Sequence, residues 1–280
     1  MNSEIKILYN TGICTITDFK CRCSYKGTSG MEYRSNFTMS YIRKGNFLFN
    51  VFEDSLDAFS GRILLSKPGF EHSVTHFDGM PDECTIFSFT NEFYESIKSE
   101  YKELQSEFFI NNDIQSLLIQ SDAGIEHLHF TILKSLNSGK ASRLLIESLA
   151  LEMLHSCFRV IYNIKKPFTL PEKIKKNHLP TIERAKQYIS ENFENDISLS
   201  ELSENCFISP FHFSRLFKSF TSYSPHHFLL DTRLKHAELL IKTTAKPITQ
   251  ICFDSGFSNL EHFSSAFKQK YKTAPSKFRK

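Results

Sequence analysis

The order of apolar and polar positions divides the chain into two parts. Up to about residue 90, short apolar runs such as 47–52 and 84–89 are separated by glycines and prolines, which predicts short β-strands in a small sandwich or barrel. From there, apolar residues recur every three or four positions over 91–105, 125–136 and 141–162, which predicts helices. Beyond residue 178 the pattern is helical throughout and requires no strand.

A linker is predicted between the two parts. Residues 165–177 follow neither period and contain two prolines and five lysines, a composition typical of a connecting segment. The predicted domains are therefore 1–164 and 178–280.

The helical part contains an internal repeat at a spacing of about fifty residues. Its upstream positions match only if one residue is slipped between the copies. The matched positions are Leu202, Phe207, Phe213, Ser214, Phe217, Lys218, Pro225 and Phe228 in the first copy, and Ile251, Phe257, Phe263, Ser264, Phe267, Lys268, Pro275 and Phe278 in the second.

Each copy is predicted to form a helix, a tight turn and a second helix, over 198–219 and 247–269. Ser198 and Glu201 have the spacing of a capping box, and Ser209 or Asn259 can cap the second helix of its copy. Pro210 suits the first position of a helix, where no N–H is needed. This unit is the helix-turn-helix, whose second helix fits the major groove of DNA.

The second helix of each copy has one apolar and one polar face. Phe213, Leu216 and Phe217 in the first copy, and Phe263, Ala266 and Phe267 in the second, are predicted to be core. The opposite faces are either solvated surface or surfaces that read DNA, and the duplication favours DNA. The predicted DNA-binding residues are Ser209, Phe211, His212, Ser214, Arg215, Lys218, Asn259, Leu260, Glu261, Ser264, Ser265 and Lys268.

The distribution of charge favours the same partner. The whole chain carries a formal net charge of only +3, but residues 1–164 carry −5 and residues 205–280 carry +8. A basic segment next to an acidic one indicates different partners for the two parts, and double-stranded DNA is the natural partner of the basic one.

Residues 182–280 resemble the DNA-binding domain of the AraC/XylS family of bacterial transcription regulators. The resemblance rests on 233–240 (Arg-Leu-Lys-His-Ala-Glu-Leu-Leu), on Gly256-Phe-Ser258, on Phe267-Lys268 and on Pro275. It implies two helix-turn-helix units joined by a long helix, with both recognition helices in successive major grooves on one face of the DNA. It also implies a transcriptional activator that responds to a small-molecule effector and has RNA polymerase as a partner.

The chain departs from the family pattern at several positions. Ser222 and Lys272 stand where glycine is usual, and a non-glycine residue costs on the order of 1 kcal/mol if that turn has a positive φ. Ser203 and Cys252 replace an alanine. Ser265 and Leu260 stand where arginine and a polar residue are common, so we expect base reading to be concentrated in the first unit, around Arg215.

The first 164 residues resemble the usual companion of this domain more loosely, through the segment 62–72 with its Pro68-Gly69 turn. The predicted fold class is therefore α+β in two domains, an N-terminal cupin-like β-barrel with helices and a C-terminal all-α double helix-turn-helix domain. The barrel is expected to sense an effector. The apolar helix at 141–162 either packs on the barrel or forms a homodimer. The effector-pocket candidates are Phe37, Tyr41, Phe47, Phe49, His72 and His76.

Metal and cofactor sites are not predicted. His72 and His76 are four residues apart, about 13 Å on a strand, which is too far to share one zinc ion. They are open to metal binding, to an effector pocket or to ordinary packing, and packing is favoured. Cys21 and Cys23 can lie on one face, but no third ligand is close in sequence. The seven cysteines include no C-x-x-C pair and are expected to be reduced and buried.

The sequence thus predicts a cytoplasmic, sequence-specific transcription regulator that is not an enzyme. It has no secretory signal pattern, no run of about 20 apolar residues and none of the common phosphate-loop, nucleophile-elbow or His-Glu-x-x-His motifs. Three alternatives remain open: a ligand-independent regulator controlled by abundance or by a protein partner, a catalytic cupin fused to a DNA-binding domain, and a non-specific architectural DNA binder.

Overall fold

The computed structural model describes residues 3–23, 26–77, 81–103, 107–139, 141–161 and 170–279. Two compact units make up the structure, which we call the sheet unit (Met1–Ser121 and Thr131–Glu183) and the helical unit (Asp122–Phe130 and Arg184–Lys280). Residues 165–169 of the predicted linker, and the predicted helix ends at 105 and 162, lie outside the described residues.

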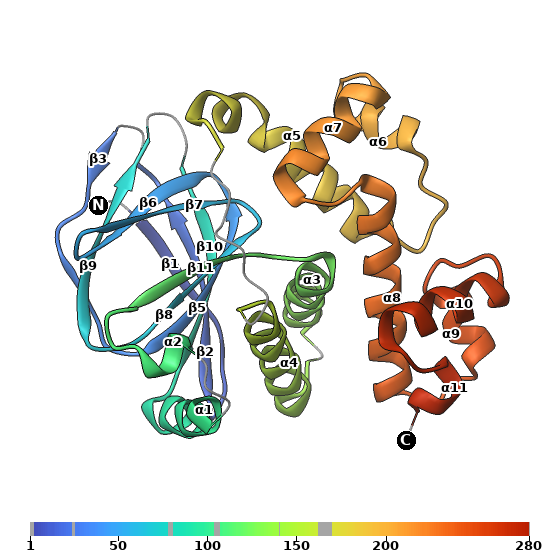
Figure 1. Cartoon of the computed structure of the whole chain (residues 1–280), viewed down its shortest axis with the longest axis horizontal. Helices are drawn as coiled ribbons and strands as arrows, with labels where there is room; N and C mark the ends of the chain where they lie inside the picture. Colours follow the sequence, from blue (N-terminus) through green and yellow to red (C-terminus); the bar gives the residue numbers. More distant parts are fainter. Residues whose placement is uncertain are drawn as a thin grey trace. The chain divides into compact units, whose positions relative to one another are not determined.

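The strands of the sheet unit form two antiparallel sheets (Figure 1). One has the order β1-β2-β10-β5-β8-β11. The other has the order β3-β9-β6-β7, with β4 also paired to β9. The strands are β1 (Ser3–Asn10), β2 (Cys14–Cys21), β3 (Gly27–Thr28), β4 (Glu32–Arg34), β5 (Phe37–Lys44), β6 (Asn46–Val51), β7 (Asp54–Phe59), β8 (Arg62–Ser66), β9 (Phe70–His76), β10 (Glu83–Phe89) and β11 (Ser116–Gln120).

The prediction of a β-barrel is wrong for the described part of the chain. A barrel requires every strand to pair on both sides, but β1 and β11 pair on one side only, and so does β7. The sheet unit is therefore a pair of open sheets. β11 was not predicted at all, although β8 and β9 do flank the predicted turn, where Gly69 has a φ of 98°.

The core of the sheet unit combines side chains from both sheets. Alternation along the strands turns every second residue inward, and the resulting cluster excludes water from the space between the sheets. Its buried members are Ile42, Phe47, Phe49, Val51, Ala58, Leu64, Phe70, Cys84 and Leu118.

The helices of the sheet unit include α1 (Asn91–Glu103), α2 (Glu107–Ile110) and α4 (Arg143–Ile161). α4 packs on the six-stranded sheet, since Cys157 Sγ lies 3.7 Å from Met39 Sδ of β5. Its Phe158 ring also meets Phe109 of α2 edge to face, with centroids 5.3 Å apart. The packing interpretation of this apolar helix is therefore confirmed. Its role in a dimer stays a prediction.

The helical unit contains no strand over 178–279, as expected. Its helices are α5 (Glu172–Asn192), α6 (Leu199–Asn205), α7 (Pro210–Thr221), α8 (Pro225–Thr243), α9 (Ile248–Asp254), α10 (Leu260–Tyr271) and α11 (Pro275–Phe278), and α5 starts in the sheet unit. Residues 172–177 of the predicted linker are thus the first turns of α5. Across the described ranges, no helix has the length and apolar content that a membrane span requires.

The helical unit also includes Asp122–Phe130, where α3 (Ala123–Asn137) begins. The buried carboxylate of Glu126 accepts a hydrogen bond of 2.6 Å from Lys186 Nζ of α5. His127 Nε2 lies 3.2 Å from His236 Nδ1 of α8. The predicted limits of the domains, 1–164 and 178–280, say which segments fold on their own. They stay predictions.

The long helix α8 joins the two repeats (Figure 1). Its first turns pack on α7, where Phe217 and Phe228 meet edge to face with centroids 5.4 Å apart. Its second half packs on α9 and α10. The hydrophobic cluster formed there comprises the buried residues Leu234, Ala237, Ile241, Ile251, Cys252, Phe257, Phe263 and Phe267.

Charged side chains of α8 fasten it to its surroundings. Glu238 is buried and accepts hydrogen bonds from Lys235 Nζ at 2.9 Å, Lys242 Nζ at 2.6 Å and the Tyr271 hydroxyl at 3.1 Å. Burial opposes its ionisation, but the two lysines outweigh burial and lower the pKa of Glu238. Arg233 Nε donates to the carbonyl of Phe193 at 2.8 Å and so ties α8 to the end of α5.

Candidate nucleic-acid interface

The two helix-turn-helix units share one turn geometry. Ile208 N donates to Ser203 O at 3.1 Å, and Phe257 N donates to Cys252 O at 3.2 Å. The preceding residues, Phe207 and Gly256, both have a positive φ, of 57° and 80°. These bonds pair Ile208 with Phe257.

The sequence match of Phe207 with Phe257 is therefore wrong. Phe207 occupies the place of Gly256 and is 86% exposed, whereas Phe257 is buried. The one-residue slip lies after the turn, since Ser209 and Asn259 both precede the recognition helix directly. Equivalent residues are 49 positions apart up to Ile208 and Phe257, and 50 apart from Ser209 and Asn259 onward. Too few residues match in between for the sequence alone to show where the spacing changes.

The helix starts follow the predicted capping only in part. Ser198 accepts a hydrogen bond from Glu201 N at 3.1 Å, but the Glu201 carboxylate turns to the Tyr188 hydroxyl instead of closing the capping box. Asn259 Oδ1 accepts from two backbone N–H groups of α10, at 2.7 and 3.1 Å. Ser209 stands at the N-cap of α7 but makes no side-chain cap bond. Its hydroxyl stays on the exposed surface, its carbonyl accepts a hydrogen bond from Phe213 N at 2.9 Å, and Pro210 occupies the first helical position.

The apolar faces of α7 and α10 are buried as predicted. Phe213, Phe217, Phe263 and Phe267 are fully buried, Leu216 is buried, and Ala266 is half-buried. The two recognition helices are thereby fixed by the same pair of aromatic anchors, four residues apart on one helix face.

The predicted DNA-binding side chains come together on the opposite faces. On α7 the exposed residues include Phe211, His212, Arg215 and Lys218, and Ser214 is half-buried. The Arg215 guanidinium carbon lies 5.7 Å from the centre of the Phe211 ring. The exposed face of α7 thus combines hydrogen-bonding side chains with cationic ones.

The face of α10 is similar but less basic at its centre. Leu260 is 38% exposed; Glu261, Ser265 and Lys268 are exposed, and Ser264 is half-buried. Ser265 lies four residues after Glu261 and so on the same face. The contacts of all these residues with DNA stay predictions.

Both recognition helices end on a left-handed residue. Ser222 has a φ of 67° and Lys272 a φ of 60°, which are the positions where the family has glycine. The positive φ that the sequence left conditional is therefore confirmed. Ser222 N donates to Lys218 O at 2.9 Å, so the strained residue closes the helix.

Two exposed aromatic residues beside the turns were not predicted. Phe207 lies with the Arg184 guanidinium 5.6 Å from its ring centre, and Phe253 of α9 is 59% exposed. Phe207 stands between Cys206 and Ile208, and Phe253 directly follows Ile251 and Cys252. Because their neighbours are apolar as well, the sequence pattern does not distinguish these two exposed rings from core residues.

The effector-pocket candidates lie in the core of the sheet unit. Phe37 stacks on Tyr94 at 5.2 Å between centroids, and Phe47, Phe49 and Tyr41 are buried. These aromatic residues already fill their space with protein contacts.

The two histidine candidates are buried as well. His72 stacks on Phe49 at 4.7 Å between centroids, and its Nε2 lies 2.9 Å from a terminal nitrogen of Arg34. Burial, helped by the Arg34 charge, lowers the pKa of His72 to about 4. His76 lies close to Asp82, with 3.0 Å between Nδ1 and Oδ1.

A cavity of about 610 Å³ opens elsewhere in the sheet unit, beside the turn between β6 and β7. None of the six predicted pocket residues lines it. Its walls are formed by Val51, Phe52, Glu53, Asp54, Leu56, Asn112, Asp113, Ile114, Gln115 and Ser116.

Comparison with known proteins finds a known type of domain in the helical unit. Residues 202–280 match the family model of a helix-turn-helix domain. A probable transcriptional regulator of Photobacterium leiognathi, LumQ, is 36% identical over 91 residues, which are 32% of this chain and 37% of that protein. The transcriptional activator RhaS of Mannheimia succiniciproducens is 33% identical over 93 residues, 33% of this chain and 35% of that protein.

The chain thus spans little more than a third of the length of these curated relatives. Among solved structures, the C-terminal domain of AraT, a response regulator from Geobacillus stearothermophilus, is 33% identical. The match covers 36% of this chain and 84% of the AraT domain, with a TM-score of 0.35.

Proposed function

We propose that this chain, whose residues 202–280 match a helix-turn-helix family model and resemble the AraC/XylS family, is a transcription regulator that binds double-stranded DNA through α7 and α10. The observation that carries the proposal is the duplication. Two recognition helices with the same buried anchors stand on one long helix, α8, and each leaves a polar face exposed.

The two faces support sequence-specific binding with unequal contributions. α7 carries Arg215, whose fork of donors can make a bidentate contact to guanine. The corresponding face of α10 carries Glu261 and Ser265, with Lys268 towards its end. We infer that α7 selects the sequence and that α10 positions the protein on the second groove.

The finer proposal is an activator that responds to a small-molecule effector. RhaS is named an activator, and AraC/XylS resemblance implies RNA polymerase as a partner. The cavity beside β6 and β7 supports an effector, because its volume lies within the range of small-molecule sites. Its walls mix apolar and carboxylate or amide side chains, so we expect it to suit a ligand with polar groups better than the six buried candidates do.

Dimerisation through the sheet unit is a further proposal. α4 buries one face, yet Leu144 remains 76% exposed at its start. Pairing two chains would raise the affinity for paired half-sites through effective concentration. Sedimentation of the full chain at tens of micromolar tests it, and a strict monomer would remove this mechanism.

The main experiment is selection of DNA from a random pool by the full chain, followed by binding isotherms on the selected and a scrambled sequence at several salt concentrations. A specific regulator should prefer the selected DNA by at least about 10³-fold. Equal affinities would favour the architectural alternative, and no binding would refute the proposal.

Transcription with purified RNA polymerase then decides between activation and repression. Thermal shift of the full chain against a panel of small molecules tests the effector. If no compound shifts the transition, regulation by abundance or by a protein partner is favoured.

A further inference from the structure

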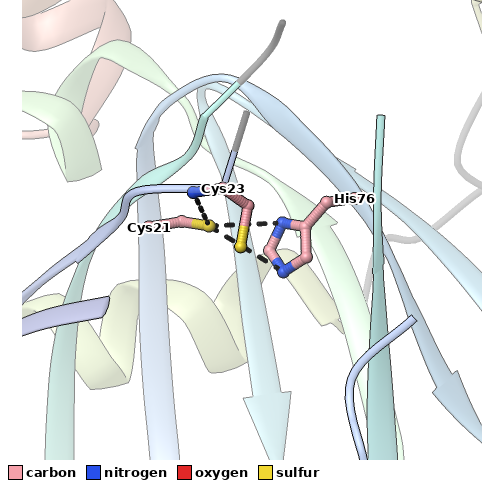
Figure 2. Close-up of side chains that lie close together, drawn as sticks. All are labelled: Cys21, Cys23 and His76. Carbon is pink, nitrogen blue, oxygen red and sulfur yellow. Dashed lines mark hydrogen bonds between the residues drawn. The ribbon is translucent and has the colours of Figure 1, made fainter. Parts of the chain in front are cut away.

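Two thiols and an imidazole converge at one end of the sheet unit, and Figure 2 shows their side chains turned toward one another. Cys21 is the last residue of β2, Cys23 follows two residues later, and His76 is the last residue of β9. β2 belongs to the six-stranded sheet and β9 to the other, so the cluster bridges the two sheets.

The donor atoms have the spacing of a metal site. The two Sγ atoms and a ring nitrogen all lie within 4.8 Å of one another, and Cys21 Sγ is 3.7 Å from Nδ1 and 4.0 Å from Nε2 of His76. Around a tetrahedral zinc ion, a sulfur and a nitrogen ligand are about 3.6 Å apart and two sulfurs about 3.8 Å apart. The bound of 4.8 Å exceeds these separations by about 1 Å, so an inward movement of the donor atoms by at most that amount would close the site.

The cluster is enclosed by protein. Cys21 is 3% exposed, Cys23 8% and His76 3%. Cys23 N donates a hydrogen bond to Cys21 Sγ at 3.3 Å, so the backbone that follows β2 holds the two cysteines close together.

Asp82 supplies the support that a histidine ligand requires. It is buried just before β10, and its Oδ1 lies 3.0 Å from His76 Nδ1. The same oxygen receives no hydrogen bond of good geometry from the described residues. A small rotation of the imidazole would direct Nδ1–H at Asp82 and leave Nε2 for the metal, which is the usual carboxylate–histidine–zinc arrangement.

We propose that Cys21, Cys23 and His76 bind one Zn²⁺ ion, with Asp82 as a positioning residue, and that the ion joins the two sheets. Thiolate and imidazole donors together suit zinc and exclude calcium or magnesium. Three protein ligands leave the fourth position to a water molecule. This proposal does not depend on DNA binding.

The test uses the full chain, stripped with a chelator under reducing conditions and then dialysed against Zn²⁺. Elemental analysis should find one zinc per chain, and the thermal transition should rise with zinc concentration. Replacement by Co²⁺ should produce thiolate charge-transfer bands and the visible bands of a tetrahedral ion. Absence of retained zinc, or a cobalt spectrum without thiolate bands, would overturn the proposal.

Variants assign the ligands. Cys21→Ser and His76→Gln should each lose the bound zinc. Cys14→Ser is the matched control, because Cys14 is a buried thiol at the other end of β2 and outside the cluster, and it should keep one zinc. Equal loss in this control would contradict the assignment.

Asp82→Asn separates positioning from ligation. It should weaken zinc binding by roughly 10 to 100-fold while leaving the cobalt spectrum of the loaded protein unchanged. An altered spectrum would show that Asp82 is itself a ligand and would refute its positioning role. If the cysteine variants do not fold, the wild-type zinc content and cobalt spectrum still decide. Retention of Cu⁺ but not Zn²⁺ would refute the choice of metal.

Discussion

The Arg215 guanidinium of α7 lies over the ring of Phe211, one turn earlier on the same exposed helix face, with 5.7 Å between the guanidinium carbon and the ring centre. Phe211 is 74% exposed, so the ring restrains the arginine without burying it. A cation over an aromatic face is worth about 0.5 to 1 kcal/mol at an exposed site. Arg215 is therefore partly ordered before it meets DNA.

Arg215→Ala should weaken binding to the selected DNA by roughly 1 to 3 kcal/mol and relax the preference at one base pair. Arg215→Lys is the matched variant, since lysine keeps the charge but not the bidentate fork. It should keep affinity for scrambled DNA and lose selectivity. Binding isotherms on DNA with single-base changes measure both effects, and unchanged selectivity in Arg215→Ala would show that another residue reads the base.

Lys218 and Lys268 lie near the ends of their helices, where they can reach the phosphate backbone. Lys218→Ala or Lys268→Ala should weaken binding to all sequences alike and lower the slope of log affinity against log salt by about one. Titrations between low and moderate salt, on selected and scrambled DNA, measure the slope. A loss confined to the selected sequence would assign the lysine to base reading instead.

Replacing the left-handed residues at the ends of α7 and α10 should stabilise the protein. Ser222→Gly and Lys272→Gly relieve a positive φ and should each raise the free energy of unfolding by roughly 0.5 to 1 kcal/mol. Ser219→Gly, inside α7 and exposed, is the control and should lower it by a similar amount. Denaturant unfolding measures all three, and destabilisation by both end variants would contradict the strain argument.

The two equivalent turns should respond differently to substitution. A Cβ on Gly256 would lie 2.5 Å from the Phe193 carbonyl oxygen and 2.8 Å from Arg233 Nε, so Gly256→Ala should destabilise the protein by about 2 kcal/mol or more. Phe207→Gly at the same place in the first unit should be neutral or stabilising, because Phe207 is exposed with a positive φ. Thermal unfolding of the two variants tests the difference, and similar losses would mean that Phe207 packs in an unforeseen way.

Acidification should destabilise the sheet unit through His72. Burial and the Arg34 charge lower the pKa of His72 to about 4, from 6.5 in the unfolded chain. Between these values the unfolded chain binds the extra proton and the folded chain does not, so stability falls as the pH falls from 6.5 to 4. The loss from this residue is at most roughly 3.4 kcal/mol, for a pKa difference of about 2.5 units. His72→Gln should show a correspondingly flatter pH dependence, and identical profiles would rule out His72 as the cause.

The sequence predicts well those features that depend on the spacing of nearby residues, such as the buried face of a helix. The anchors Phe213 and Phe217 lie four residues apart within one helix, so periodicity alone identifies their face, and the second copy repeats it. The match of Phe207 with Phe257 failed because a turn can absorb one extra residue without changing the helices around it. Backbone hydrogen bonds, which the sequence does not display, decide that correspondence.

The sheet unit depends on pairings between distant segments. Whether β1 and β11 meet is not encoded in either strand, so the pattern could not distinguish an open pair of sheets from a barrel. Cys21 and His76 are likewise brought together only because β2 and β9 end at the same place. The short run Ser116–Gln120 resembles neither of its helical neighbours, and its pairing with β8 makes it a strand.

The continuous helix α8 has a consequence for the promoters that we propose as targets. Nineteen residues at about 1.5 Å each form a rod of about 28 Å without glycine or an internal proline, fixed at both ends by aromatic packing. Such a rod cannot stretch or swivel to follow its target. One base pair inserted between the two contacted grooves would move them apart by about 3.4 Å and turn one about the duplex axis by about 35°. The helix thus fixes the separation of the two recognition helices. Operators should therefore tolerate base changes at the centre of the site far better than insertions there.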